Sequence, residues 1–338
     1  MTPRGSATGS IRMAARSPRL VEMLRARACA GKASDGGVLT SSHYGLAWPQ
    51  RVEVCQPRQC WVLGLLVRPR PTTTDERRVI VARTIAVASQ KGGVGKTTTV
   101  ASLGVALAEL GEEVLLVDLD PQACLTFSLG LDPELLQLAL PDVLAGRVGL
   151  RDVITATEEG VDLVPSTIAL AQSEAAMLTG DASEYVLKRA LVSVLDHYDW
   201  ILLDCPPTLG VLTVNALTAA DEVLVPLQCE TLAHRGVGQV VETVLAVTQV
   251  SNPRLRILGV LPTMYDSRTA HARAVLADIA GRYDMPVLDP PIPRSVRFAE
   301  APALGRSVLS TSPGIRGVEA YRTHAQWLLA AARVEPSR

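Results

Sequence analysis

The segment Lys91-Gly92-Gly93-Val94-Gly95-Lys96-Thr97-Thr98 lies between two stretches of different periodicity. Residues 84–89 form an apolar, β-branched run typical of a buried strand, whereas residues 97–110 repeat apolar side chains at helical spacing up to Gly111. The segment is therefore expected to be a glycine-rich loop between a strand and a helix. Such a loop lets backbone N–H groups approach an anion, and the helix N-terminus adds partial positive charge.

Two lysines distinguish this loop. Lys96 is expected to reach the β- and γ-phosphates of a nucleotide, and the Thr97 hydroxyl to hold Mg²⁺. The usual pattern G-x-x-x-x-G-K-[ST] is incomplete, because Gln90 replaces its first glycine and Lys91 follows. Since Lys96 already neutralises the phosphates of its own nucleotide, the extra cation indicates an ATPase that works as a dimer. The alternatives are a turn that binds no nucleotide and, for Lys91, an ordinary surface lysine.

Three further motifs accompany the loop. Residues 114–122 (VLLVDLDPQ) end an apolar strand with two carboxylates, residues 200–207 (WILLDCPP) end another strand with Asp204, and residues 292–302 (IPRSVRFAEAP) form a third signature. With these motifs the loop resembles the deviant Walker A box of the ParA/MinD group. The chain is similar to the ParA/Soj branch of chromosome- and plasmid-partitioning ATPases over roughly residues 83–332.

The resemblance implies a role for each charged residue. Asp204 binds Mg²⁺ through water, Asp120 orients or activates the attacking water, and Asp118 supports the metal shell together with Thr97. Lys91 crosses to the nucleotide of the other subunit, so that Lys91, Lys96 and Asp120 form the catalytic set. For Asp118 and Asp120 the alternative is a solvated strand end or a helix cap. The implied nucleotide contacts come from the loop and from two later residues near the base: Lys91, Gly92, Gly93, Val94, Gly95, Lys96, Thr97, Thr98, Met264 and Pro293.

The same resemblance implies a function. ATP and Mg²⁺ are the expected cofactors, and ATP drives formation of a homodimer that binds DNA without sequence preference. A ParB-type centromere-binding partner stimulates hydrolysis and releases the dimer. The expected location is the cytoplasm, on the nucleoid.

Composition is compatible with this function. With 338 residues and 48% hydrophobic content the chain can build one large α/β core. Only 4% of residues are aromatic, which argues against base stacking as a mode of nucleic-acid binding. No apolar stretch approaches the ~18 residues that span a bilayer, so no membrane partner is expected. None of the six cysteines forms C-x-x-C, which argues against a zinc ribbon or an iron–sulfur carrier and fits a reducing cytosol.

Charge is segregated along the chain, although the net charge is only −1. Residues 1–83 carry +9, residues 84–250 carry −15 and residues 251–338 carry +5. The basic C-terminal part suggests a face for a polyanion. Arg268 and Arg297 align with family arginines implicated in sequence-independent DNA binding, and Arg294 is a nearby candidate, since a guanidinium can grip phosphate oxygens. Each arginine could instead be a solvated surface charge.

Residues 1–83 are expected to be a separate, basic and largely disordered extension, and residues 84–333 the ATPase domain. The extension has three open interpretations. Translation starts further along the chain or the segment is a non-conserved addition; the segment is a basic DNA-binding arm; or it is an organellar transit peptide.

The remaining sequence alternates between strand and helix patterns, which predicts a doubly wound, mostly parallel sheet with helices on both faces. Strands are expected at residues 161–164, 200–203, 222–226, 257–261 and 286–288, and helices at residues 168–176, 184–195, 209–219, 237–250, 270–279 and 318–332. The last helix has an apolar side but few cations, which argues against a membrane-targeting helix.

Two other functions stay open. One is a related positioning ATPase for another cargo or a MinD-like division-site regulator; the other is a metal-cluster carrier or small-molecule enzyme on the same fold. One departure bears on the choice: residues 123–126 read Ala-Cys-Leu-Thr where many chromosomal members have Gly-Asn-Ala-Thr. A plasmid-type or orphan member therefore stays open.

Overall fold

The computed structural model describes residues 82–178, 183–230 and 233–334. Residues 1–81, and with them nearly all of the basic extension, lie outside the described residues. The first described strand begins at Arg83, one residue before the predicted domain boundary. Ala82 is already buried, and its backbone N–H donates to the carbonyl of Leu195 at 2.9 Å.

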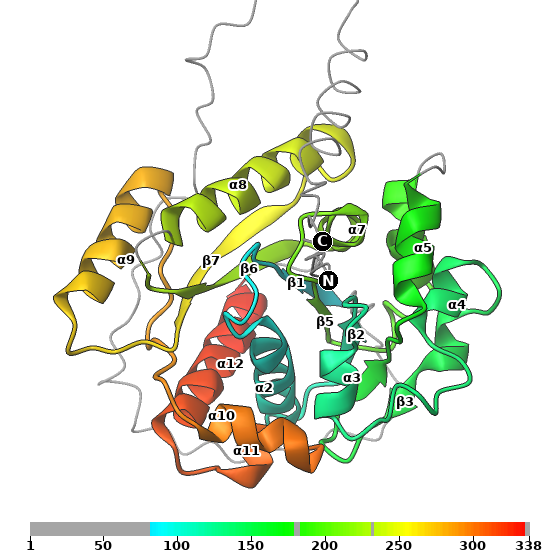
Figure 1. Cartoon of the computed structure of the whole chain (residues 1–338), viewed down its shortest axis with the longest axis horizontal. Coiled ribbons are helices and arrows are strands. Elements are labelled where there is room, and N and C mark those ends of the chain that lie inside the picture. Colours follow the sequence, from blue (N-terminus) through cyan, green and yellow to red (C-terminus); the bar gives the residue numbers. More distant parts are fainter. Residues whose placement is uncertain (1–81, 179–182, 231–232, 335–338) are drawn as a thin grey trace, which may run out of the picture.

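A seven-stranded sheet in the order β3-β4-β2-β5-β1-β6-β7 forms the centre of the described chain (Figure 1). Every neighbouring pair is parallel except β3 with β4. Parallel strands end at the same edge of a sheet, so the loops after β1, β2 and β5 meet there. The strands are β1 (Arg83–Val87), β2 (Val114–Asp118), β3 (Thr155–Ala156), β4 (Asp162–Val164), β5 (Trp200–Asp204), β6 (Glu222–Gln228) and β7 (Arg256–Thr263).

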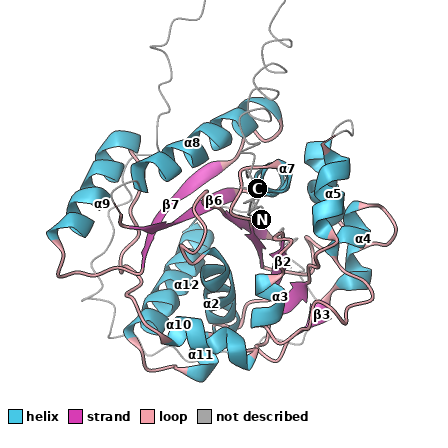
Figure 2. Ribbon diagram, in the orientation of Figure 1, coloured by secondary structure: helices cyan, strands magenta, loops and turns pink. Residues whose placement is uncertain are grey.

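Helices cover both faces of the sheet, as predicted (Figure 2). Three short 3₁₀ turns, η1 (Leu150–Val153), η2 (Ser183–Tyr185) and η3 (Ala301–Leu304), complete the pattern in the described segments. The α-helices are α2 (Lys96–Glu109), α3 (Cys124–Ser128), α4 (Leu140–Leu144), α5 (Leu170–Met177), α6 (Val186–Leu191), α7 (Val211–Ala219), α8 (Ala233–Val250), α9 (Ala270–Tyr283), α10 (Arg297–Glu300), α11 (Val308–Thr311) and α12 (Arg316–Val334).

Strand alternation divides the core into two layers. Ile85 and Val87 of β1 pack toward α2, α11 and α12, whereas Ala86 packs toward α4 to α9 on the opposite face. All three side chains are fully buried. Both faces of the sheet are apolar, which is why β1, β2 and β5 read as continuous hydrophobic runs in the sequence.

Two sequence predictions are wrong. Residues 286–288 do not form a strand, because only Val287 bridges to Val260 of β7. The helix expected at residues 184–195 is shorter, since η2 precedes α6 and α6 ends at Leu191. Residues 286–288 include a proline and are too few to extend the hydrogen-bond ladder of the sheet. Residues 184–195 end in an irregular turn before β5.

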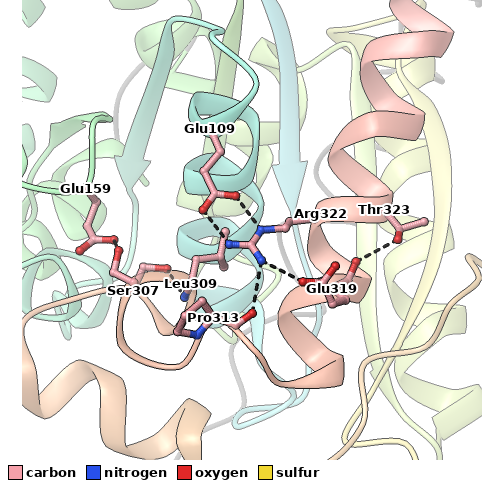
Figure 3. A network of polar contacts seen from close by, with 9 residues as sticks. Glu109, Glu159, Ser307, Leu309, Pro313, Glu319, Arg322 and Thr323 are labelled. Atoms are coloured by element: carbon pink, nitrogen blue, oxygen red, sulfur yellow. Dashed lines mark hydrogen bonds and ion pairs between the residues drawn. The ribbon is translucent and has the colours of Figure 1, made fainter. Parts of the chain in front are cut away.

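The last helix, α12, packs against α2, the helix that follows the glycine-rich loop. Arg322 donates from Nε and Nη2 to the two carboxylate oxygens of Glu109, at 2.7 and 3.0 Å, and from Nη1 to Glu319 at 2.9 Å (Figure 3). Beside this clamp, the Tyr321 hydroxyl and the Thr99 hydroxyl lie 3.0 Å apart in the core. The apolar side of this helix, with Tyr321, Ala325 and Leu328, thus packs on the core. In the described segments no helix is both long and apolar enough to span a membrane.

Candidate nucleotide site

The glycine-rich loop connects β1 to α2, as the sequence predicts. Gly93 and Gly95 adopt left-handed backbone angles (φ 71° and 89°), which side chains with a Cβ rarely tolerate. Gly95 is the residue immediately before α2, so these angles turn the loop into the helix N-terminus. Thr263, the last residue of β7, fixes the loop from the other side, because its hydroxyl donates to the Val94 carbonyl at 2.7 Å.

Two carboxylates lie side by side at the ends of adjacent strands. Asp118 and Asp204 are register partners on β2 and β5, and both are fully buried. Neither Asp204 oxygen has a hydrogen-bond partner among the described residues. Burial, followed by the charge of Asp118, raises the pKa of Asp204; the Thr97 hydroxyl and Lys96 oppose this rise, although the hydroxyl does not reach hydrogen-bond geometry.

A buried carboxylate without a partner is costly unless a cation compensates it. Asp204 lies beside Thr97 and Lys96 at the start of α2, so the oxygen set fits a hydrated Mg²⁺ ion, which prefers carboxylate, hydroxyl and water ligands. Asp204 and Thr97 are therefore suited to hold the metal.

Asp118 is already engaged within the protein. Its Oδ1 accepts the backbone N–H of Asp120 at 3.1 Å, and its Oδ2 accepts the backbone N–H and the hydroxyl of Thr126 at 2.9 and 2.7 Å. Burial raises its pKa to about 6, against the effect of these hydrogen bonds. The structure therefore brings Asp118 next to the predicted metal site but commits its oxygens to the loop that follows β2.

Asp120 is half-buried in that loop, two residues beyond the strand. Its Oδ1 accepts the Gln122 backbone N–H at 2.9 Å, so part of the carboxylate caps the turn. Its charge contributes to the raised pKa of Asp204, which places it at the same edge of the sheet.

Lys91 and Lys96 occupy different environments. Lys96 is buried at the first position of α2. The side chain of Lys91 is about half exposed, and its ammonium group lies 3.2 Å from Gln228, the last residue of β6, and 2.5 Å from Glu230, two residues further on. Nothing in the sequence pattern indicated that the second lysine has partners in its own chain.

The two predicted base-contacting residues lie on adjoining segments. Met264 follows β7 with a left-handed backbone (φ 48°), and Tyr265 and Pro293 form a parallel bridge. The Tyr265 backbone N–H donates to Ile292 at 2.9 Å. Segments almost thirty residues apart in the sequence thus meet beside the glycine-rich loop that Thr263 contacts.

The three candidate DNA-binding arginines are exposed on the segments that follow β7. Arg268 makes a bidentate ion pair with Asp266, from Nε to Oδ1 at 2.9 Å and from Nη2 to Oδ2 at 2.8 Å. This hydrogen bonding lowers the pKa of Asp266 to about 2. The charge of Arg294 also lowers it. Arg297 pairs with Glu300 at 2.7 Å on α10. Two of the three guanidinium groups therefore already have a carboxylate partner.

The fold and the loop together define a P-loop NTPase. A family model described as an AAA domain matches residues 82–257. The chain is 43% identical to the sporulation initiation inhibitor protein Soj of Bacillus subtilis, over 71% of this chain and 96% of that one. It is 42% identical to the chromosome partitioning protein ParA of Caulobacter vibrioides, over 74% and 95% of the two chains.

Two solved structures show the same fold with nucleotide. One, described as cobyrinic acid a,c-diamide synthase from Mycobacterium smegmatis with a bound ATP analogue and magnesium, is 52% identical with a TM-score of 0.68, over 75% of this chain and 97% of that one. The other, the septum site-determining protein MinD of Pyrococcus horikoshii with Mg-ADP, is 28% identical with a TM-score of 0.61, over 75% and 99%.

The chain belongs to the ParA/Soj family of partitioning ATPases within the ParA/MinD group. It is therefore a P-loop ATPase.

Proposed function

We propose that this protein is a DNA-partitioning ATPase that dimerises around ATP, binds DNA without sequence preference and hydrolyses ATP when a ParB-type partner stimulates it. The observation that carries the proposal is the pair of lysines on one phosphate loop. Lys96 is buried at the helix start, whereas Lys91 is half exposed and paired only at the surface. One nucleotide needs only the first of them, so the second is available to another subunit.

The chemistry of hydrolysis follows from the residues around the loop. Lys96 and the backbone N–H groups of the loop bind the phosphates, and Thr97 and Asp204 hold the hydrated Mg²⁺ ion. When bound, the ion would offset the negative charge that develops on the phosphate oxygens. Asp120 orients the attacking water, while Met264 and Pro293 border the base.

DNA binding is assigned to Arg268, Arg294 and Arg297. All three are exposed, and Arg268 and Arg294 lie close enough for both charges to act on Asp266. Arginine contacts to phosphate oxygens require no base sequence, which suits a protein that binds the nucleoid as a whole. The proposed location is accordingly the cytoplasm, on nucleoid DNA.

The name of the 52% identical structure favours a second candidate, an enzyme that forms amides with ATP. If such an enzyme draws ammonia from glutamine, it needs a thiolate nucleophile activated by a basic partner. Within the described segments the three cysteines, Cys124, Cys205 and Cys229, all have thiol pKa values raised mainly by burial, the last to about 11. None of the three hydrogen-bonds to a described histidine. These features favour partitioning over amide formation.

A binding experiment tests the proposal. The full chain, with ATP, ADP or no nucleotide, is titrated onto two duplexes of unrelated sequence. We expect the protein to bind DNA only when ATP is present and to bind both duplexes with equal affinity. Equal binding in all nucleotide states, or no binding in any of them, would overturn the proposal. Consumption of ATP that depends on ammonia and on a carboxylic acid substrate would support the second candidate.

A further inference from the structure

A cycle of buried hydrogen bonds holds the loop that carries Asp120. Asp118 Oδ1 accepts the N–H of Asp120, and Asp118 Oδ2 accepts both the N–H and the hydroxyl of Thr126 on α3. Thr126 Oγ1 in turn accepts the N–H of Ser166 at 2.9 Å. The Ser166 hydroxyl closes the cycle by donating to the Asp120 carbonyl at 2.9 Å.

The cycle connects three separate parts of the fold. Asp118 ends β2, Thr126 lies on α3, and Ser166 follows β4, which is the neighbour of β2 in the sheet. All three side chains are fully buried. The backbone N–H of Asp120 is therefore held by the end of β2, and its carbonyl by Ser166 after β4 and by the N–H of Ala123, so the carboxylate of Asp120 stays at the edge of the site.

Thr126 is the member that the others depend on. Its hydroxyl donates to Asp118 and accepts from Ser166, so its removal takes one donor from the buried Asp118 carboxylate and leaves the buried Ser166 N–H without its partner. Thr126 and Ser166 touch neither the loop that binds phosphate nor the Asp204 carboxylate in any described hydrogen bond. Among the described residues, their side-chain hydrogen bonds reach only Asp118, Asp120 and each other.

We infer that Thr126 and Ser166 are positioning residues for ATP hydrolysis, which hold the Asp120 carboxylate where it orients the attacking water. The inference rests on the proposed role of Asp120. The inference also gives Asp118 a role. Its two oxygens accept hydrogen bonds within the protein, and through them Asp118 anchors the cycle. A catalytic group displaced by about 1 Å loses roughly 10²-fold in rate, whereas ground-state binding of the substrate is much less sensitive.

Four variants test the inference. Thr126→Val removes the hydroxyl at nearly constant volume, Ser166→Ala removes the bond to Asp120, and Thr126→Ser returns the hydroxyl. Thr218→Val is the matched control, because Thr218 is equally buried and its hydroxyl lies 2.8 Å from Ser251, in a part of the core that does not contact the site. For each, kcat, KM for ATP, affinity for a non-hydrolysable ATP analogue and thermal stability are measured.

We expect Thr126→Val to lower kcat about 10- to 100-fold and Ser166→Ala about 10-fold, with KM and analogue affinity nearly unchanged. Thr126→Ser should recover most of the turnover. Thr218→Val should lose a similar amount of stability as Thr126→Val but keep its kcat. If Thr126→Val and Thr218→Val changed kcat alike, or if analogue affinity fell in step with kcat, the positioning role would be refuted.

Asp120→Ala separates this inference from the proposed role of Asp120. If Asp120→Ala hydrolysed ATP normally, the water-orienting role itself would fail. If Asp120→Ala were inactive while Thr126→Val and Ser166→Ala turned over normally, only the positioning role of the cycle would fail.

Discussion

The ammonium group of Lys91 lies 2.5 Å from the Glu230 carboxylate in the single chain. Both side chains are about half exposed, so the pair contributes only about 0–1 kcal/mol. An interaction this weak can be exchanged at small cost for the phosphates of a nucleotide on a second subunit. If Lys91 reaches the nucleotide of a second subunit as proposed, Glu230 competes with dimer formation for the same lysine.

Replacing either partner of this pair should change assembly in opposite directions. Lys91→Ala should bind ATP almost normally but remain monomeric, because the cross-subunit cation is removed. Glu230→Gln should dimerise more tightly, by up to about fivefold (about 1 kcal/mol) for each of the two pairs that dimer formation breaks. Sedimentation velocity over a range of protein concentrations measures both effects. An intact dimer of Lys91→Ala with ATP would show that the lysine acts only within its own chain.

The two remaining charged residues of the catalytic set should separate binding from chemistry. Lys96→Ala should abolish ATP binding, because the phosphates lose their principal cation. Asp120→Ala should bind ATP with normal affinity and fail to hydrolyse it. Fluorescent-nucleotide titration and phosphate release are the measurements, and a fall in ATP affinity in Asp120→Ala would assign that carboxylate to binding.

Asp204→Asn should stabilise the nucleotide-free protein while impairing hydrolysis. Removing a buried charge that has no partner is expected to raise the free energy of unfolding by about 1–3 kcal/mol at neutral pH. Removing a metal-site carboxylate should lower Mg²⁺-dependent turnover about 10- to 100-fold. Thermal denaturation without nucleotide and a magnesium titration of turnover check the two effects. A variant less stable than the wild type would mean that the carboxylate has a compensating partner.

The same carboxylates predict a pH dependence. Because the pKa of Asp204 is raised, and that of Asp118 is raised to about 6, the folded protein keeps protons that the unfolded chain releases near pH ~4. Stability from Asp118 is present at low pH and is lost as pH rises from about 4 through about 6, and stability from Asp204 is lost as pH rises through its own raised pKa. Denaturant unfolding from about pH 4.5 to about pH 7.5 should therefore show a smaller decrease for Asp204→Asn than for the wild type, and parallel curves would contradict the assignment.

DNA binding should depend on the exposed arginines and on salt. Removing one phosphate-binding cation lowers the slope of log affinity against log salt by roughly one unit, so Arg268→Ala and Arg297→Ala should each flatten it while ATP-dependent dimerisation persists. Asp266→Asn should tighten binding, because it frees the Arg268 guanidinium from its internal carboxylate partner. A chain without residues 1–81 is the control: if its binding vanished while the arginine variants bound normally, the extension would be the DNA-binding arm.

Local patterns predicted six of the seven strands, the phosphate loop and the long helices, because each of these depends on near neighbours in the sequence; β3 has only two residues and was missed. The β1–loop–α2 unit follows from its apolar run, its glycines and the helix that Gly111 ends. The short helices α3, α10 and α11 were not predicted, since four or five residues carry no periodic signal. The Lys91–Glu230 pair and the Ser166–Asp120 hydrogen bond join residues 139 and 46 positions apart, and only the fold brings them together.

The central claim is that ATP, and not ADP, joins two protomers. The most direct test is the mass of the full-length Asp120→Ala protein, measured by light scattering with ATP and with ADP, since this variant cannot exhaust its nucleotide. We expect twice the 36.0 kDa chain mass with ATP and a single chain mass with ADP. The same mass in both nucleotides would contradict the claim.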